Sequence, residues 1–360
     1  MRVQLNLRTN ILHTSAVVTG FHMLAEAGEL TLEINDIRRA AAEYAAPSSV
    51  NTVARDAFSA QYGASAPEDA LIDAVVDGRR VVFDLSDGYR YNDSEAVMRC
   101  FSEADVIFKR SFSDEENAAL NAPIRDRIRP LGMNYFVTYK GNPLTPADHG
   151  IHRLIKSAKL TNSYVSDFET QPLCRKRRPR VLFLARLWDP DGSDIAGDAA
   201  LAEERRYINR MRTDTVRILR ERFGGSFFGG IYRDGFSERY CPELLVGKTV
   251  TLKRSYLHRM RRSDICINTM GLHGSIGWKT AEYVAAARAI VSEEFVYSIP
   301  GGFDDGINYL SFHSPEECAE RVEMLMEDEK ARLEMSRANR DYYENRLRPD
   351  AQIRQALRQL

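Results

Sequence analysis

Short β-rich runs alternate with longer stretches of helical periodicity along the whole chain. In the first half, the predicted strands cover residues 3–7, 30–34, 80–85, 105–108 and 134–137. Between the first two strands, Val17, Phe21 and Leu24 recur at helical spacing, and Gly28 can end that helix in a left-handed conformation. Strands that alternate with helices are typical of βαβ units, so the sequence predicts an α/β fold with mostly parallel sheets.

A second series of strands is predicted at residues 180–184, 227–231, 249–253, 264–268, 289–292 and 309–312. Helical patterns separate them at residues 199–223, 256–262 and 278–287, and a long helical stretch from 315 to 360 is broken near Pro349. A chain of 360 residues exceeds what one hydrophobic core usually serves. We therefore expect two Rossmann-like, doubly wound domains that face each other across a cleft.

The boundary between the domains is expected in residues 140–180, which contain four prolines and the basic run Arg175-Lys176-Arg177-Arg178. The predicted organisation is an N-terminal domain over residues 1–150, a linker over 151–178 and a C-terminal domain over 179–340. Residues 341–360 are expected to form a last helix that packs back toward the first domain. The basic run is interpreted as a solvated linker, with weak peripheral attachment to an anionic membrane as the alternative.

The amino-acid composition limits which partners and which cellular compartment can be expected. Lys and Arg total 50 against 51 Asp and Glu, so the net charge of −1 gives no general field for nucleic acid, and any anion site must be local. Neither a signal peptide nor a run of ~20 apolar residues is present, so we expect a cytoplasmic protein, with the inner face of the membrane as an alternative. Five widely spaced cysteines without a CxxC pair suggest neither a disulfide framework nor a zinc site.

The most informative segment is SDICINTMGLHGSIGWKTAEYVAAARAIVS, residues 263–292, which reads as strand, loop, helix and strand. Gly271, Gly274 and Gly277 allow backbone amides to approach a ligand closely. The helix that begins at Trp278 directs its positive end at this loop. Such a helix start binds a pyrophosphate well, and Lys279 and Ser275 can add direct contacts.

This segment resembles the C-terminal domain of GT-B-fold glycosyltransferases of the family 1 and family 4 type, through GSIGWKTAEYVAAARAIVSEE. The family places two glutamates eight positions apart, and the second contacts the ribose hydroxyls of the donor. Glu282 stands at that second place. Gly274 replaces the first glutamate, so its contacts would pass to His273 or Ser275, and Ile276 belongs to the same donor-binding loop.

A second match to the family lies at VLFLARLWDPDG, where Arg186 takes the place of an arginine that meets the donor phosphates. The lysine that the family often carries a few residues later is absent here. Lys253 and Arg254, which follow the predicted strand at 249–253, are the candidates to supply that positive charge. The tail YLSFHSPEECAERVEM is also similar to the family, so the resemblance covers residues 180–345.

The acceptor is expected on the loops that follow the first and third strands, residues 8–15 and 84–93. Asp87, Asp84 and His13 are the candidate bases for an acceptor hydroxyl if transfer inverts the anomeric centre. If transfer retains configuration, no base is needed, and His13 would hydrogen-bond the donor sugar. Each has a structural alternative as the cap of a turn or helix. Lys109 and Arg110, after the fourth strand, are interpreted as a solvated basic pair, with contact to a phosphate on the acceptor, such as a lipid-linked sugar, as the alternative.

The resemblance implies a glycosyltransferase that moves a sugar from a nucleotide diphosphate sugar to a sugar, glycan or lipid-linked glycan, in bacterial-type surface polysaccharide or glycoconjugate synthesis. No cofactor besides the donor substrate and no metal is expected, because no convincing DxD-like motif follows a strand in the donor half. Two alternatives stay open. One is a nucleotide-sugar epimerase of the same fold, and the other is a catalytically silent nucleotide- or sugar-binding protein.

Overall fold

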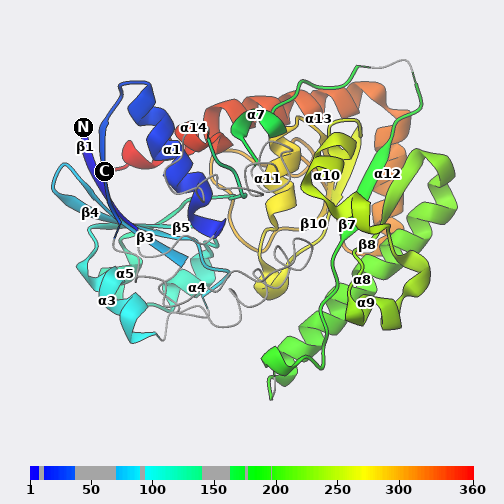
Figure 1. The fold of residues 1–360 in the computed structure, drawn as a ribbon, viewed down its shortest axis with the longest axis horizontal. Helices are drawn as coiled ribbons and strands as arrows, with labels where there is room; N and C mark the ends of the chain where they lie inside the picture. The colour runs from blue at the N-terminus through cyan, green and yellow to red at the C-terminus, as the bar shows by residue number, and fades with distance from the viewer. Residues whose placement is uncertain (8–11, 37–69, 90–93, 140–162, 175–176, 196) are drawn as a thin grey trace, which may run out of the picture.

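The structure is a computed structural model that describes residues 1–7, 12–36, 70–89, 94–139, 163–174, 177–195 and 197–360. Two α/β halves lie side by side, each built around one sheet (Figure 1). The strand order is β2-β1-β3-β4-β5-β6 in the first sheet and β11-β10-β9-β7-β8 in the second. The predicted fold class, with two α/β domains, is confirmed.

The first sheet is mixed. Its strands are β1 (Arg2–Leu7), β2 (Thr31–Asp36), β3 (Leu71–Val76), β4 (Arg79–Asp84), β5 (Val106–Lys109) and β6 (Ile128–Pro130). Strand β3, which the sequence analysis missed, runs antiparallel to both β1 and β4, whereas the other pairs are parallel. Asp77 and Gly78 join β3 to β4 with φ values of 46° and 88°. An Asp-Gly pair with positive φ at both positions is the usual two-residue hairpin turn, so the signal was present in the sequence.

Two of the predicted strands are wrong. Residues 134–137 lie outside the sheet, whose edge strand is β6, and Tyr135 and Val137 are instead buried in a core cluster shared with the second half. Residues 249–253 form a 3-10 turn, η6 (Lys248–Thr251), and the start of helix α10 (Lys253–Met260). Lys253 and Arg254 therefore open a helix and do not follow a strand.

Helices cover both faces of the first sheet. Helices α1 (Ser15–Glu26) and α14 (Pro349–Leu357) cover one face, and α3 (Glu95–Glu103) and α5 (Ala122–Arg125) cover the other. Side chains alternate along β4 accordingly. Phe83 packs with the cluster around α1, whereas Val82 packs with the cluster around α3. This period of two follows from the pleat of a strand.

The second sheet is parallel throughout. Its strands are β7 (Val181–Ala185), β8 (Phe227–Ile231), β9 (Ile265–Asn268), β10 (Ala289–Glu293) and β11 (Leu310–Phe312). Helices α8 (Ala199–Phe223) and α12 (Pro315–Glu327) pack on the face that carries Phe183, and α10 and α11 (Trp278–Ala285) pack on the face that carries Leu184. The crossover helices leave the loops at the carboxyl ends of these strands to build a site.

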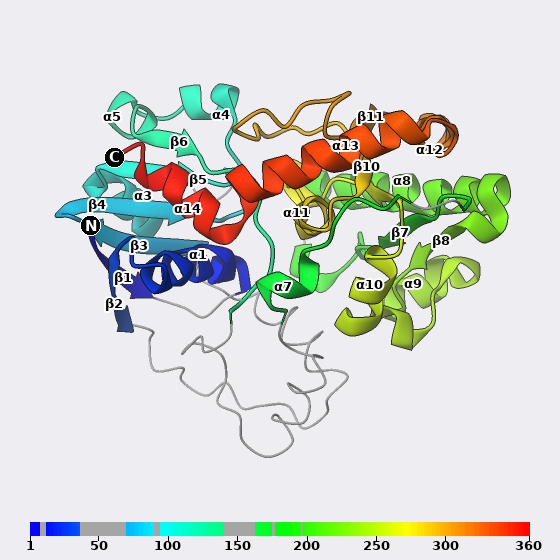
Figure 2. The ribbon, with the colours of Figure 1, turned by 90° about the horizontal axis from the view of Figure 1, so that it is seen from above.

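The C-terminal helices run across both halves (Figure 2). Helix α13 (Glu329–Tyr342) packs against α11 and β10, a π-helical turn, η8 (Tyr343–Leu347), follows, and α14 packs against α1. A side-chain carbon on Gly20 of α1 would lie 2.3 Å from the carbonyl oxygen of Pro349. The helices thus meet at backbone contact, which requires glycine at this position.

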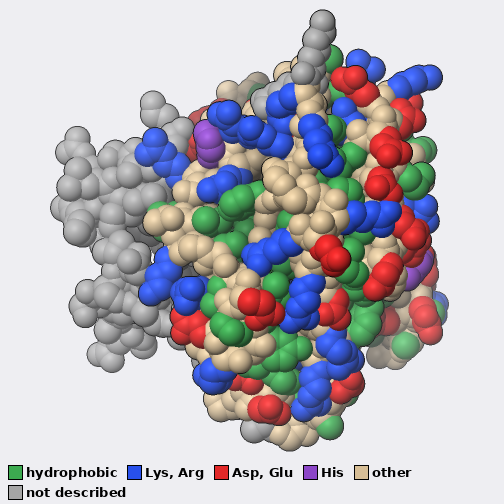
Figure 3. Space-filling model, turned by 90° about the vertical axis from the view of Figure 1, so that its right-hand side faces the viewer, with side chains coloured by type: hydrophobic (Ala, Val, Ile, Leu, Met, Phe, Trp, Pro, Cys, Tyr) green, Lys and Arg blue, Asp and Glu red, His purple; other side chains and the backbone are tan. Residues whose placement is uncertain are grey.

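The face of the second half shown in Figure 3 carries basic and acidic side chains side by side. Ion pairs occur along α8, such as that of Arg217 with Asp214 at 2.7 Å. None of the helices in the described part of the chain has both the length and the apolar character to cross a membrane. Four cysteines are buried, and only Cys174 is exposed.

Candidate active site

The loop between β9 and α11 has the glycine-dependent geometry that the sequence predicts. His273 and Gly274 are consecutive residues with φ values of 59° and 62°. At Gly271, a side-chain carbon would come within 2.5 Å of the Ser275 hydroxyl, and the Gly271 amide donates to the Ser275 carbonyl at 2.9 Å. The loop therefore folds back on itself before the helix starts.

Helix α11 begins after Gly277 without a side chain that caps it. The helix start therefore keeps its positive character for a ligand. The Lys279 ammonium donates to the carbonyl of Leu184 and lies 5.0 Å above the ring of Tyr232, beyond the carboxyl ends of β7 and β8. Burial, helped by the charge of Arg212, lowers the pKa of Lys279 to about 7.

Arg212 on α8 holds two loops of the site together and was missed by the sequence analysis. Its guanidinium donates to the Arg186 carbonyl at 2.5 Å, to the Thr269 hydroxyl at 3.0 Å and to the Met270 carbonyl at 2.8 Å. Burial lowers its pKa to about 10. A signal existed, because Arg212 stands four residues after Ile208 on the buried stripe of α8.

The loop is also held from α8 through Glu204, a second residue that the sequence analysis missed. The Glu204 carboxylate accepts from the backbone amide of His273 and lies 3.8 Å from the His273 Nδ1. On the other side, the Tyr297 hydroxyl donates to the His273 carbonyl at 2.9 Å. His273 thus has its backbone fixed, and its ring lies beside a carboxylate.

The remaining candidates of the donor half lie at three places. The guanidinium of Arg186, just after β7, lies 4.4 Å from the centre of the Trp188 ring. Glu282 on α11 is buried, and its carboxylate lies 2.5 Å from Lys253 Nζ. Arg254 is exposed next to Lys253 at the start of α10. Lys253 is therefore paired with Glu282 and is not an isolated cation.

In the first half, the structure separates the roles of the two aspartates. Asp84 is buried, and its carboxylate accepts from Lys109 Nζ at 2.5 Å and from the hydroxyl of Ser86 at 2.5 Å. The interpretation of Lys109 and Arg110 as a solvated pair is wrong, because both are buried. Their burial follows from ion pairs, Lys109 with Asp84 and Arg110 with Asp87.

Asp87 and His13 are the first-half candidates that approach the donor loop. The His13 ring meets the ring of Trp278 edge-on at 5.0 Å, and Gly88, next to Asp87, adjoins His273 and Tyr297. Burial lowers the pKa of His13 to about 4. Burial alone would raise the pKa of Asp87, but the charges of Arg110, His13 and His273 outweigh it, and that pKa is lowered.

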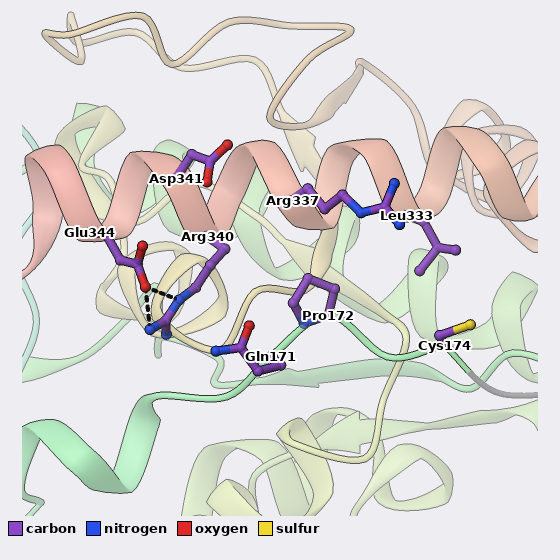
Figure 4. Close-up of a pocket in the computed structure, with 8 residues that line it drawn as sticks. All are labelled: Gln171, Pro172, Cys174, Leu333, Arg337, Arg340, Asp341 and Glu344. Atoms are coloured by element: carbon purple, nitrogen blue, oxygen red, sulfur yellow. Dashed lines mark hydrogen bonds and ion pairs between the residues drawn. The ribbon is translucent and has the colours of Figure 1, made fainter.

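The structure thus brings residues from both halves to the start of α11. Of the two acceptor loops, residues 8–11 and 90–93 lie outside the described part of the chain. Figure 4 shows a separate hollow of about 460 Å3 between the segment at Gln171–Cys174 and α13, which contains none of the candidate residues. Within the described ranges, no group of three or more His, Cys, Asp or Glu side chains is arranged to hold a metal ion.

Comparisons with known proteins find a family model that resembles part of the second half. Residues 212–358 match the family model described as "Glycosyl transferase-like", a segment that includes Arg212, the donor loop and α11. No curated protein sequence matches the chain.

Among the proteins of known structure that are similar to this chain, three are given below. HepE from Anabaena, in complex with UDP and glucose, is 15% identical, with 74% of this chain and 66% of that chain covered and a TM-score of 0.36. Sucrose-phosphate synthase from Thermosynechococcus elongatus is 12% identical, with 77% and 66% covered and a TM-score of 0.38. The C-terminal domain of LpcC from Francisella tularensis, a glycosyl transferase group 1 family protein, is 13% identical, with 50% and 95% covered and a TM-score of 0.35.

Proposed function

We propose, from the match of residues 212–358 to the glycosyl transferase-like family model, that the protein moves a sugar from a nucleotide diphosphate sugar to a hydroxyl of a sugar, glycan or lipid-linked glycan. The observation that carries the proposal is the uncapped start of α11, which bears Lys279 in its first turn and which His13 of the other half meets at Trp278. A role in surface polysaccharide or glycoconjugate synthesis fits this reaction. The family match favours transfer over epimerisation.

The donor diphosphate would lie at the start of α11. Backbone amides and the helix dipole favour an anion there, and charge on the departing nucleotide diphosphate grows during the reaction. Lys279 and Arg186 stand beyond the end of β7 and would share that charge. With fixed cations and amides in this position, we infer a reaction that does not require a metal ion.

Glu282 would bind the ribose of the donor. A carboxylate can accept from both hydroxyls of a diol, and Glu282 lies on the first turns of the same helix as the diphosphate site. Its ion pair with Lys253 holds the carboxylate in place although it is buried. Lys253 would then act through Glu282, whereas the exposed Arg254 would contact only the periphery of the nucleotide.

The first half would supply Asp87 and His13 at the reacting sugar. A general base works best when its pKa lies near the working pH. The pKa of His13 is about 4, and that of Asp87 is lowered below its ordinary value. Neither group is matched to remove a proton from a hydroxyl at neutral pH, which favours a retaining transfer in which His13 hydrogen-bonds the donor sugar. Close contact of the halves would exclude water and limit hydrolysis of the donor.

The test is a titration of the purified protein with UDP-, GDP- and ADP-sugars by calorimetry, followed by nucleotide release with and without candidate acceptors. Release that depends on an acceptor supports transfer. An isomerised sugar without an acceptor identifies an epimerase, and binding without turnover identifies a silent binding protein. The anomeric configuration of the product, read by NMR, decides between retention and inversion, and full activity in excess EDTA would support the metal-independent reaction.

A further inference from the structure

Arg110 links the first half to the donor loop by a direct hydrogen bond. It follows β5 directly and is 3% exposed. One branch of its guanidinium, Nη1, donates to Asp87 Oδ1 at 2.7 Å and lies 3.5 Å from His13 Nδ1. The other branch, Nη2, donates to the carbonyl of Ile276 at 2.6 Å, across to the second half. One planar group therefore contacts both acceptor-side candidates and the donor loop.

The bond to Ile276 fixes the peptide that leads into α11. The peptide between Ile276 and Gly277 is trans, so its N–H points away from its C=O. With the carbonyl directed at Arg110, the Gly277 amide points away from Arg110. The bond from Arg110 therefore fixes the orientation of the last peptide before α11. The orientation of this peptide determines which backbone amides at the start of the helix face the first half.

The location of Arg110 also matters for the contact between the halves. Helices α14 and α1 pack tightly at Gly20, and a shared core cluster also joins the halves. Arg110 adds a polar contact between the halves, and the Ser298 amide donates to the Phe112 carbonyl at 2.9 Å as a second one. A lysine could not replace the arginine, because a single ammonium lacks the two opposed donors of a guanidinium fork.

We propose that Arg110 is a positioning residue that holds the first half against the donor loop and fixes the entry of α11, so that the diphosphate site and the pair Asp87 and His13 form together. This inference rests on the proposed function only where it names the ligand as a diphosphate. The contact between the halves does not depend on it. Breaking this contact would let His13 move away from Trp278 and loosen the first half beside the helix start, although the shared core cluster still joins the halves.

The experiment compares Arg110→Gln and Arg110→Lys with the matched surface variant Arg125→Gln, whose side chain pairs only with the neighbouring Asp126 among the ion pairs of the described residues. The chain has two tryptophans, so a Trp188→Phe background makes Trp278 the sole reporter of the contact with His13. The readouts are Trp278 emission and small-angle X-ray scattering without ligand, the pKa of His13 by NMR, and kcat and KM in the background with both tryptophans.

We expect both Arg110 variants to shift Trp278 emission to longer wavelength, to increase the radius of gyration and to raise the pKa of His13 toward 6.5. In addition, kcat/KM should fall by about 10- to 100-fold, the scale of a lost charge-assisted hydrogen bond. Arg125→Gln should change none of these. If Arg110→Gln does not fold, Arg110→Lys, which keeps the charge, decides the question.

Unchanged Trp278 emission and radius of gyration in a folded Arg110 variant would overturn the inference, whatever the activity. Absence of sugar transfer by the unmodified protein would instead count against the proposed function, because the emission and scattering readouts need no donor. Altered emission and scattering together with unchanged kcat/KM would show that Arg110 holds the halves without positioning the site, which also rejects the inference.

Discussion

Lys253 Nζ lies 2.5 Å from Glu282 Oε1, and the Glu282 side chain is only 3% exposed. The pair joins the first turn of α10 to the middle of α11, the helix whose start forms the candidate diphosphate site. Burial makes the Glu282 carboxylate dependent on Lys253, because a buried charge without a partner costs several kcal/mol. The candidate ribose ligand is therefore also a structural residue.

Glu282→Gln should weaken nucleotide binding by about 1–3 kcal/mol, because the amide cannot accept from both hydroxyls of the ribose. The free energy of unfolding should fall as well, since Lys253 loses its partner. Calorimetry and chemical unfolding measure the two effects, with the exposed Glu221→Gln on α8 as the control. A folded Glu282→Gln protein with an unchanged dissociation constant would exclude the ribose role.

Arg186→Ala should lower kcat more than it weakens nucleotide binding. Charge on the departing diphosphate grows along the reaction, so a phosphate-binding guanidinium contributes more in the transition state than in the ground state. Steady-state kinetics and calorimetry on the same preparation measure both, with Arg206→Ala on the exposed side of α8 as the matched control. If Arg186→Ala instead weakens nucleotide binding more than it lowers kcat, the role of Arg186 is only to bind the nucleotide.

Nucleotide binding should take up protons between pH 7 and 8. The pKa of Lys279 is about 7 without a ligand, and an adjacent diphosphate stabilises the ammonium and raises that pKa. Calorimetry in buffers of different ionisation enthalpy measures the uptake. Lys279→Arg, which stays charged throughout this range, should remove it while it keeps a cation in place. Persistent uptake in that variant would assign the proton to another group.

Acid should destabilise the protein through His13. Its pKa is about 4 in the folded protein and 6.5 in the unfolded chain, so the unfolded state binds more protons between these values. Stability is therefore complete above pH 6.5 and falls as the pH drops toward 4, by about 3 kcal/mol at most. His13→Gln should flatten the pH dependence of the unfolding free energy in this window, whereas the exposed His258→Gln should leave it unchanged. An equal slope in both variants would contradict the assignment.

Gly20→Ala should lower the free energy of unfolding by about 1–3 kcal/mol, the usual cost of overpacking a tight contact. The new methyl group would collide with the Pro349 carbonyl, so α14 must move away from α1. Thermal unfolding measures the loss, and amide hydrogen exchange in residues 349–357 locates it. Gly247→Ala, where nothing lies within 4 Å of the added carbon, is the control. Unchanged protection of α14 would show that the helices adjust without cost.

Local periodicity was enough to predict the elements whose pattern lies within one stretch of chain. The helix at 199–223 and the strand at 227–231 have the predicted limits, and the order strand, loop, helix and strand around Gly271–Gly277 is as expected. The hairpin at Asp77-Gly78 could have been predicted from its turn. Residues 134–137 and 249–253 could not be assigned this way, because apolar content alone does not say whether a segment finds a neighbouring strand.

The sequence by itself determined the two α/β halves and the glycine loop, because spacing and turn chemistry are encoded locally. Only the tertiary structure decided which charges face one another. Arg110 meets Ile276 from 166 residues away, and Glu204 meets His273 from 69 residues away. From the sequence alone, a basic residue after a strand is predicted to be solvated. Only the folded structure shows that a carboxylate and a carbonyl contact it, and because the residue is buried it needs these contacts.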